Sequence, residues 1–580
     1  MKYEFGLNLE ELEKRTHKDY LVTKKMLDEN APEFEALDEG DKIALSYLVK
    51  AARIIEKINM QLDSHHNLPF KNFIEEEIKK GNKKAKLTKI LFDAQKGIFA
   101  LDCESNLIKL ASKLDKKAGR GLYPEDLEVD EFHKILIKMI KSGKIDEVKK
   151  ILNQRSVVER KDDELVAIDY IDKFNEDFKE IAKYLLKASC VSTNSDFNEY
   201  LRLQSNAFLK ADSMLDAYAD KKWATLQDTP LEFTITRENY TDEMTETVLE
   251  NAELNNLLKE NNIEVISKDY LGARVGIVNK EGTNYILKVK DFLPLMAKNM
   301  PLADKYEQVI SNDSEVSQTM VDVDLVEVAG DVGAFRAGIT LAENLPNNDK
   351  LSLTIGGGSR NVYHRQIRFV TSDDAKQKIQ ERLDAILDKT LHKFYDDKMD
   401  HPFTIGHENG HSLGPKEGCE ALGKYKSIIE ENKADMVALS MLDVLSEAGL
   451  YTKEEKEQII VTYATDNMLK SKPTLSQAHR VRSVMQNYYF IKEGAIEISK
   501  DGILFVHIDK MIETARKMLT EIIEVQLSGD FARGEKYVLD NFIWNDEMEE
   551  ISKKLKKISK RLNGTTEQKL ADKLFKENLD

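Results

Sequence analysis

The segment Thr404-Ile-Gly-His-Glu-Asn-Gly-His-Ser-Leu-Gly-Pro415 contains the pattern His-Glu-x-x-His, formed by His407, Glu408 and His411. Histidines four residues apart lie one turn apart on the same face of a helix, about 6 Å along its axis. Both imidazoles can therefore bind one zinc ion, and the glutamate after the first histidine can accept a proton from metal-bound water. Two histidines on one helix face also occur as ordinary surface residues, and the Asn-Gly pair between them is a poor helix former.

A second segment, Ser427-Ile-Ile-Glu-Glu-Asn-Lys-Ala-Asp435, follows about one helix further on. A glutamate from it can complete a His₂Glu site that leaves a fourth position for water. Glu431 and Asp435 share a helix face, so the aspartate can accept the other N–H of a ligating imidazole and fix its tautomer. Spacing alone does not decide whether Glu430 or Glu431 binds the metal. A solvated acidic face is the alternative, since the chain has 103 carboxylates.

Composition narrows the class of partner. The 580 residues include 86 Lys and Arg against 103 Asp and Glu, which gives a formal charge of −17. This charge repels phosphate and argues against nucleic acid or an anionic membrane as a partner. The first twenty residues have no apolar signal-peptide core, and no apolar run approaches the ~18 residues of a membrane span. We therefore expect a cytoplasmic protein.

Periodicity predicts a chain that is helical at both ends. Residues 1–225 read as helix almost throughout, 226–372 contain β-strands, 373–545 are helical again, and 546–580 form a helical tail. The predicted strands are Leu231–Thr236, Ala273–Val278, Tyr285–Val289, Asp324–Val328, Leu351–Ile355 and Gln366–Val370. The tail contains the basic run KKLKKISKRL, which favours a surface helix packing one apolar stripe over a membrane or nucleic-acid helix.

The pair HENGH and EENKAD resembles the dipeptidyl peptidase III family of zinc metallopeptidases. Most members carry a six-residue HExxGH-type motif, and some bacterial members share the five-residue form found here. The resemblance implies one zinc ion bound by His407, His411 and Glu431, with Glu408 as the catalytic base. Glu430 and Asp435 would support the ligands. Asp435 stands where a glutamate is common in the family, so its side chain is shorter by one methylene and reaches less far.

Shorter matches occur in the family's order between residues 225 and 493. Residues 236–242 resemble its E-S-Y-R-D stretch, 343–349 its N-x-P-N segment, and 477–482 its Ala-His segment. The roles implied by these matches are binding of the substrate's amino group by Glu238, binding of its backbone by Asn344 and Asn347, and oxyanion stabilisation by Tyr240 and His479. The family's arginine four residues after the histidine is Ser483 here, and Arg480 and Arg482 lie out of register.

The resemblance also implies the architecture and the reaction. We expect an α+β, predominantly helical fold of two lobes with a cleft, one helical and zinc-binding, the other with a small five-stranded barrel or sheet. The expected activity is a zinc-dependent exopeptidase that releases N-terminal dipeptides from short peptides, as a monomer or homodimer. A thermolysin-like endopeptidase, a metalloaminopeptidase, and a peptide-binding protein with little turnover are the alternatives.

Overall fold

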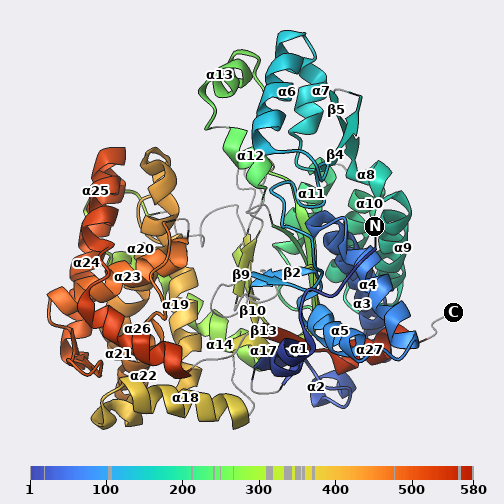
Figure 1. Ribbon diagram of the computed structural model, residues 1–580. Coiled ribbons are helices and arrows are strands. Elements are labelled where there is room, and N and C mark those ends of the chain that lie inside the picture. Colours follow the sequence, from blue (N-terminus) through green and yellow to red (C-terminus); the bar gives the residue numbers. More distant parts are fainter. Residues whose placement is uncertain are drawn as a thin grey trace. The chain divides into compact units, whose positions relative to one another are not determined.

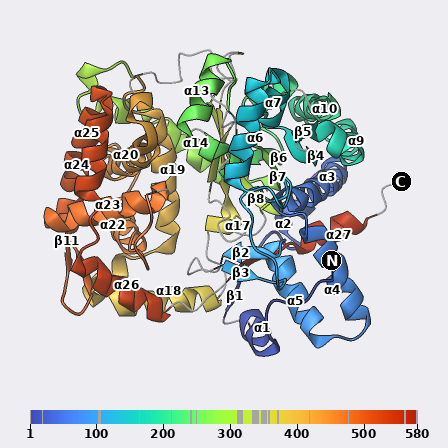
Figure 2. The same cartoon turned by 45° about the horizontal axis from the view of Figure 1, so that its top comes forward.

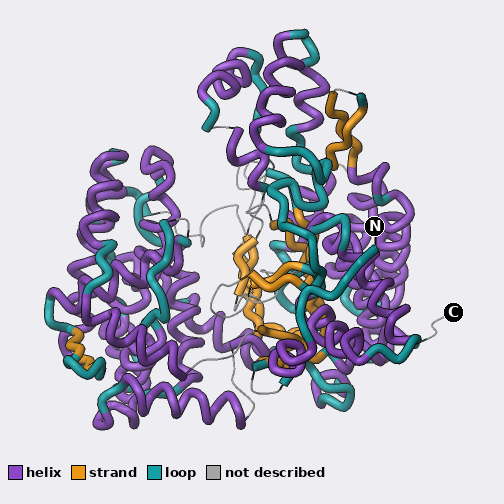
Figure 3. The backbone as a smooth tube through the Cα atoms, in the orientation of Figure 1, coloured by secondary structure: helices purple, strands orange, loops and turns teal. Residues whose placement is uncertain are grey.

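The structure is a computed structural model, and most of its elements are helices (Figures 1 and 3). It describes residues 2–577 apart from 18–19, 102–106, 163, 211–212, 239–241, 249, 266, 309–317, 332–341, 346–354, 356–358, 369–372, 418, 476 and 559–562. The described chain folds into two compact units. Unit 1 comprises residues 1–279, 321–366 and 561–580, and unit 2 comprises 280–320 and 367–560. These units divide the chain differently from the four consecutive segments expected from the sequence.

Unit 1 contains a five-stranded sheet in the order β6-β7-β8-β10-β9. Its strands are β6 (Leu231–Glu238), β7 (Tyr270–Val278), β8 (Gln318–Ala329), β9 (Ala342–Leu345) and β10 (Ser359–His364). The pairs β6–β7, β7–β8 and β9–β10 are antiparallel. Every residue of β7 is buried. The strands at the two ends of this order, β6 and β9, do not pair among the described residues, so the sheet is open and the expected barrel is not closed.

Helices cover this sheet. The long helix α3 (Glu39–Asp63) packs on β7 and on α9, because its buried face repeats small and branched apolar residues at helical spacing (Figure 2). The other unit 1 helices are α1 (Leu9–Thr16), α2 (Pro32–Glu35), α4 (Asn67–Lys79), α5 (Lys83–Gln95), α6 (Val129–Lys141), α7 (Ile145–Ile151), α8 (Tyr170–Lys173), α9 (Asn175–Val191), α10 (Ser195–Lys210), α11 (Ser213–Trp223), α12 (Glu243–Val248), α13 (Ala252–Glu260) and α27 (Lys569–Lys576), with α17 (Arg365–Arg368) at its boundary.

The predicted helical region 1–225 is interrupted by strands. Two antiparallel hairpins lie in it, β2 (Phe99–Leu101) with β3 (Leu107–Lys109), and β4 (Ser156–Lys161) with β5 (Glu164–Asp169). The second hairpin turns at Asp162, which has a φ of +53°. Its strands carry many charged residues, so their short apolar alternation is weak beside the surrounding helical periodicity.

The tail also departs from the helical prediction. Helix α26 (Asp546–Ile558) buries Met548, Ile551 and Leu555 and packs on α18, as expected of a surface helix with one apolar stripe. The chain then enters unit 1, where β13 (Asn563–Glu567) pairs in parallel with β1 (Leu21–Lys25). No helix in the described residues combines the length and the apolar character needed to cross a lipid bilayer.

The described residues of unit 2 are almost all helical or in loops, apart from a short hairpin of β11 (Ile496–Ile498) and β12 (Leu504–Val506) (Figure 3). Its helices are α14 (Lys280–Lys290), α15 (Leu293–Lys298), α18 (Asp373–Ile386), α19 (Asp400–Ser412), α20 (Lys426–Ser440), α21 (Leu442–Glu447), α22 (Lys453–Asp466), α23 (Ala478–Lys492), α24 (Ile508–Ser528), α25 (Phe531–Asn541) and α26. Helix α20 contacts α19, α23, α24 and α25, and every residue from Asn432 to Ser440 is buried.

Three of the predicted strands fall in β6, β7 and β8, two others coincide with helices where they are described, and the sixth lies almost entirely outside the described residues. Residues Tyr285–Val289 belong to helix α14, where Thr283, Ile286 and Val289 are buried at helical spacing. Burial of one helix face therefore outweighs the β propensity of the Tyr-Ile-Leu-Lys-Val run. Residues 365–368 are helical in α17, and Leu351–Ile355 lies outside the described residues except for Ile355, which is in a turn.

The last helix is anchored to the central strand of unit 1. The Gln568 amide donates to Glu327 Oε1 over 2.7 Å and accepts from the Val328 backbone N–H over 2.7 Å. Arg53 of α3 bridges Glu327 and Asp572 at 2.9 and 2.7 Å. The C-terminal segment is therefore an integral part of unit 1.

Truncation of Leu570 tests this role of the tail. Leu570 is fully buried in α27, and Leu570→Ala is expected to cost about 2–5 kcal/mol of unfolding free energy, because a cavity remains. Chemical denaturation followed by circular dichroism measures the loss. Lys576→Ala, an exposed change on the same helix, is the control and should unfold like the unmodified chain. Equal stability of the two variants would contradict an integral role.

Candidate metal centre

Close packing of α19 on α20 brings the two sequence motifs together. Gly406 and Gly410 lie one turn apart on α19 and face Ala434 and Ala438 of α20. A Cβ at Gly410 would lie 2.8 Å from the Ala434 carbonyl oxygen, and one at Gly406 would lie 3.1 Å from Ala438 Cβ. Glycine is a poor helix former, and here it permits a backbone approach that a side chain would prevent.

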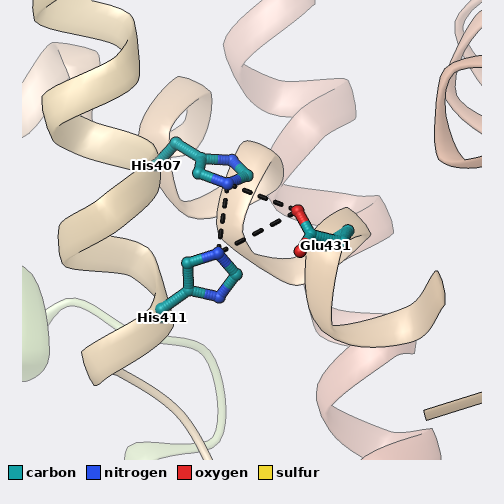
Figure 4. Close-up of side chains that lie close together, drawn as sticks. All are labelled: His407, His411 and Glu431. Carbon is teal, nitrogen blue, oxygen red and sulfur yellow. Dashed lines mark hydrogen bonds and ion pairs between the residues drawn. The ribbon is translucent and has the colours of Figure 1, made fainter. Parts of the chain in front are cut away.

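Three side chains converge where these helices meet: His407 and His411 from α19 and Glu431 from α20 (Figure 4). The two Nε2 atoms are 3.1 Å apart. Glu431 Oε2 lies 3.4 Å from Nε2 of His407 and 4.0 Å from Nε2 of His411. Within the described part of the chain, these residues form the group whose donor atoms lie close enough to hold a metal ion.

The opposite nitrogen of each imidazole faces a carboxylate. His407 Nδ1 lies 2.7 Å from Asp435 Oδ1, and His411 Nδ1 lies 3.1 Å from Glu430 Oε1. Because an ionised carboxylate only accepts hydrogen bonds, each Nδ1 carries a proton, and each Nε2 of a neutral ring presents a lone pair. A cation that displaces any proton on Nε2 would therefore meet two nitrogen lone pairs and one carboxylate oxygen. The donor set of two imidazoles and one carboxylate fits zinc.

The electrostatics of the group also favour a cation. Burial alone lowers the pKa of His407, but the carboxylates of Asp435 and Glu431 outweigh it and raise that pKa to about 10. Burial would raise the pKa of Glu431, yet His407 and His479 hold it far below its usual value. The pKa of Asp435 is likewise low despite its burial, because of Arg482 and His407. These carboxylates therefore stay ionised and attract positive charge.

Comparison with known proteins identifies the fold. A solved structure of dipeptidyl peptidase III from Caldithrix abyssi matches with a TM-score of 0.78 and 23% identity, over 97% of this chain and all of that one. The fold is that of dipeptidyl peptidase III. A second such structure, from Corallococcus sp. strain EGB, matches with a TM-score of 0.73 and 19% identity over 99% of both chains. The expected fold class is thus confirmed.

Comparison by sequence finds more distant similarity. No protein-family model matches the chain. A curated relative from Arabidopsis thaliana, named Nudix hydrolase 3, is 23% identical over 551 residues, which cover 85% of this chain. The chain spans 66% of that relative's length.

Glu430 is held in place by groups that the sequence reasoning missed. Lys433 Nζ lies 2.7 Å from Glu430 Oε1, and Gln526 Nε2 of α24 donates to Glu430 Oε2 over 3.0 Å. Lys433 is fully buried and also donates to the Leu413 carbonyl oxygen, at the end of α19, over 2.5 Å. Glu430 thus contacts Nδ1 of His411, whereas Glu431 faces the Nε2 atoms of both histidines. The two glutamates, which spacing alone does not tell apart, therefore have different positions.

Helix α23 contributes a further set of contacts in this dipeptidyl peptidase III fold. His479 Nδ1 lies 3.1 Å from Glu431 Oε2, and the His479 side chain is 71% exposed. Arg482 forms an ion pair with Asp435, and Gln486 Nε2 donates to Asp435 Oδ2 over 3.0 Å. The positions 479, 482 and 486 follow the three-and-four spacing of a helix face. This spacing is visible in the sequence, but the sequence analysis assigns a role to His479 alone.

The two arginines out of register with the family have separate partners. Arg480 donates to the carbonyl oxygen and hydroxyl of Ser471 over 2.9 and 2.8 Å. Arg482 pairs with the buried Asp435. In this structure both guanidinium groups therefore bind groups of their own unit.

The remaining residues predicted for the site are divided between the two units or lie outside the described residues. Glu408 is half-buried on α19, next to His407. Glu238 is the last residue of β6, and Asn344 lies in β9 opposite Asn361. Tyr240 and Asn347 lie outside the described residues. Glu238 and Asn344 belong to unit 1, whereas the histidines and Glu431 belong to unit 2.

A methyl group at Gly410 tests the role of helix packing. In an unhindered helix, Gly→Ala adds up to about 1 kcal/mol of stability. At Gly410 the added carbon meets the Ala434 backbone, and overpacking of this kind costs about 1–3 kcal/mol. Gly410→Ala is therefore expected to lower the free energy of unfolding, measured by chemical denaturation of the metal-free chain. A more stable variant would show that the helices can separate without cost.

Proposed function

We propose that this chain is a zinc-dependent exopeptidase that releases dipeptides from the N-termini of short peptides. The observation that carries the proposal is the convergence of His407, His411 and Glu431, with both Nδ1 atoms held by carboxylates. Its support is the match of nearly the whole chain to two solved dipeptidyl peptidase III structures.

His407, His411 and Glu431 would hold one zinc ion, and Asp435 and Glu430 would fix the orientation of the two imidazoles. Three protein ligands leave a position for water, as in catalytic rather than structural zinc sites. When bound, zinc polarises the scissile carbonyl group and lowers the pKa of that water.

Proton transfer falls to Glu408. It follows the first histidine on α19 and would accept a proton from the attacking water and deliver it to the leaving amine. His479 would donate to the oxyanion that develops on the substrate, together with Tyr240. Since Nδ1 of His479 faces Glu431, its Nε2 would be the nitrogen available to the substrate.

Residues of unit 1 would determine which peptide bond is cleaved, counted from the N-terminus of the substrate. Glu238 would bind the free amino group of the peptide, and the carboxamides of Asn344 and Asn347 would donate to and accept from its backbone. Restricting the distance between the amino group and the cleaved bond sets the product length at two residues.

The proposal includes the setting in which the enzyme works. Short peptides are the substrates, the location is cytoplasmic, and the chain is a monomer or homodimer with neither nucleic acid nor membrane as partner. The charge of −17 supports the exclusion of nucleic acid. The plant relative's name belongs to a longer protein, one third of which lies outside the match, so it supports no second activity here.

Metal content and turnover should separate in single variants. The unmodified chain is expected to hold one zinc ion, and His407→Ala and His411→Ala to lose it, by elemental analysis after dialysis. Glu408→Gln should keep zinc while kcat falls by about 10²–10⁴, because the general base is lost. His392→Ala, which removes a histidine of unit 2 outside the cluster, is the control. Zinc without any hydrolysis would favour the peptide-binding alternative, and absence of zinc would refute the metal site.

Product mapping tests the exopeptidase register. Defined peptides of different lengths, incubated with the unmodified chain, should release N-terminal dipeptides detectable by mass spectrometry. Acetylation of the amino group should abolish cleavage, because an amide can no longer pair with Glu238. Release of single residues would indicate an aminopeptidase, and internal cuts of acetylated peptides an endopeptidase.

A further inference from the structure

One face of α23 contacts two of the three carboxylates that α20 brings to the two histidines, Glu431 and Asp435. His479 faces Glu431, whereas Arg482 and Gln486 bind Asp435. Gln486 is fully buried, as is Asp435. The proposed mechanism gives His479 a role but leaves the buried amide of Gln486 without one.

We propose that Gln486 is a positioning residue of the metal centre, which holds Asp435 in the orientation that accepts the Nδ1 proton of His407. This inference rests on the proposed zinc site and extends it to a residue that touches neither metal nor substrate. It assigns to α23 a supporting role in metal affinity.

The orientation of the Gln486 amide is set by its neighbours. The Tyr463 hydroxyl donates to Gln486 Oε1 over 2.6 Å, and Asn467 Nδ2 donates to the same oxygen over 3.1 Å. The Gln486 Nε2 group therefore points the other way, toward Asn432 Oδ1 at 2.9 Å and Asp435 Oδ2 at 3.0 Å. A reversed amide would place an oxygen against the Asp435 carboxylate and two N–H groups against donors, so one orientation is selected.

This orientation matters because an aspartate carboxylate rotates easily. Its terminal torsion is broad, so the plane of the Asp435 carboxylate depends on what its two oxygens bind. Oδ1 accepts from His407, and Oδ2 accepts from both Arg482 and Gln486. Contacts on both oxygens fix the plane, and His407 then keeps its Nδ1 proton and directs Nε2 toward the metal position.

Arg482 and Gln486 both donate to Asp435 Oδ2, but only Arg482 carries a charge. The guanidinium of Arg482 compensates the buried negative charge of Asp435. Gln486 is neutral, so replacing it leaves the charge of the site unchanged. A change in zinc affinity on replacing Gln486 would therefore report lost geometry rather than an altered field.

The matched pair Gln486→Met and Asn487→Leu separates positioning from stability. Both changes remove a buried amide of α23 at similar size, but Asn487 bonds only to Asn467 among the described contacts. Zinc affinity is measured by competition with a chromogenic chelator, and coordination by the visible absorption of the cobalt-substituted chain. Gln486→Met is expected to weaken zinc binding by about tenfold, at the low end for outer partners of metal ligands, and to alter the cobalt spectrum. Asn487→Leu should bind both metals as the unmodified chain does.

Tyr463→Phe provides a second, milder variant. It keeps the ring that packs on Phe403 at a centroid distance of 4.6 Å but removes the hydroxyl that orients Gln486. Weaker zinc binding in this variant, smaller than in Gln486→Met, would support the inference. Unchanged zinc affinity in both variants would overturn it while leaving the metal site intact. Failure of the unmodified chain to bind zinc would instead overturn the proposed function.

Discussion

The distance between helices α19 and α20 is the constraint on which the metal centre depends. Two glycines on one helix and two alanines on the other allow a backbone contact that larger side chains would forbid. The imidazoles and the carboxylates come from different helices, so a small shift of either helix would move the donors apart. Asp435 has a shorter side chain than a glutamate, yet it reaches His407 Nδ1 at 2.7 Å. The close approach of the helices makes this possible, and the glycines that weaken α19 as an isolated helix are the residues that permit this approach.

Burial of the carboxylates at this site requires that each of them has a partner. Asp435 is fully buried, and Glu430 and Glu431 are largely so. A buried carboxylate is stable only when paired and hydrogen-bonded. Arg482 and Gln486 meet this need for Asp435, and Lys433 and Gln526 meet it for Glu430. Glu431 differs, because its neighbours are His407, His411 and His479, whose charge depends on protonation. Glu431 is thus the carboxylate that faces both Nε2 atoms, which is where a divalent cation would lie between the three donors.

Sequence reasoning succeeded where spacing alone fixes geometry. The positions 407 and 411, and likewise 431 and 435, share helix faces because of the 3.6-residue period. The order of the two motifs and the strands β6, β7 and β8 could also be read from the chain. The choice between Glu430 and Glu431 could not, because adjacent residues point in different directions by an amount that depends on how the helices cross. Tyr285–Val289 was wrongly read as strand, since burial of one helix face is a tertiary effect. The return of the tail to unit 1 as β13 depends on a partner strand more than 500 residues earlier, which no local pattern can reveal.

The two units differ in how they hold their candidate residues. In unit 2 every proposed ligand sits on a helix. His407 and His411 each face a carboxylate of α20, and Glu431 faces His479 of α23. This is the arrangement expected of a preorganised centre, in which donors need not move when the ion binds. In unit 1, Glu238 lies at the end of β6 and Asn344 lies in β9. These are the two outer strands of the described sheet. An outer strand offers unpaired backbone groups to an extended peptide. The proposed metal ligands therefore all belong to unit 2, and substitutions there would change metal affinity without altering the candidate substrate residues of unit 1.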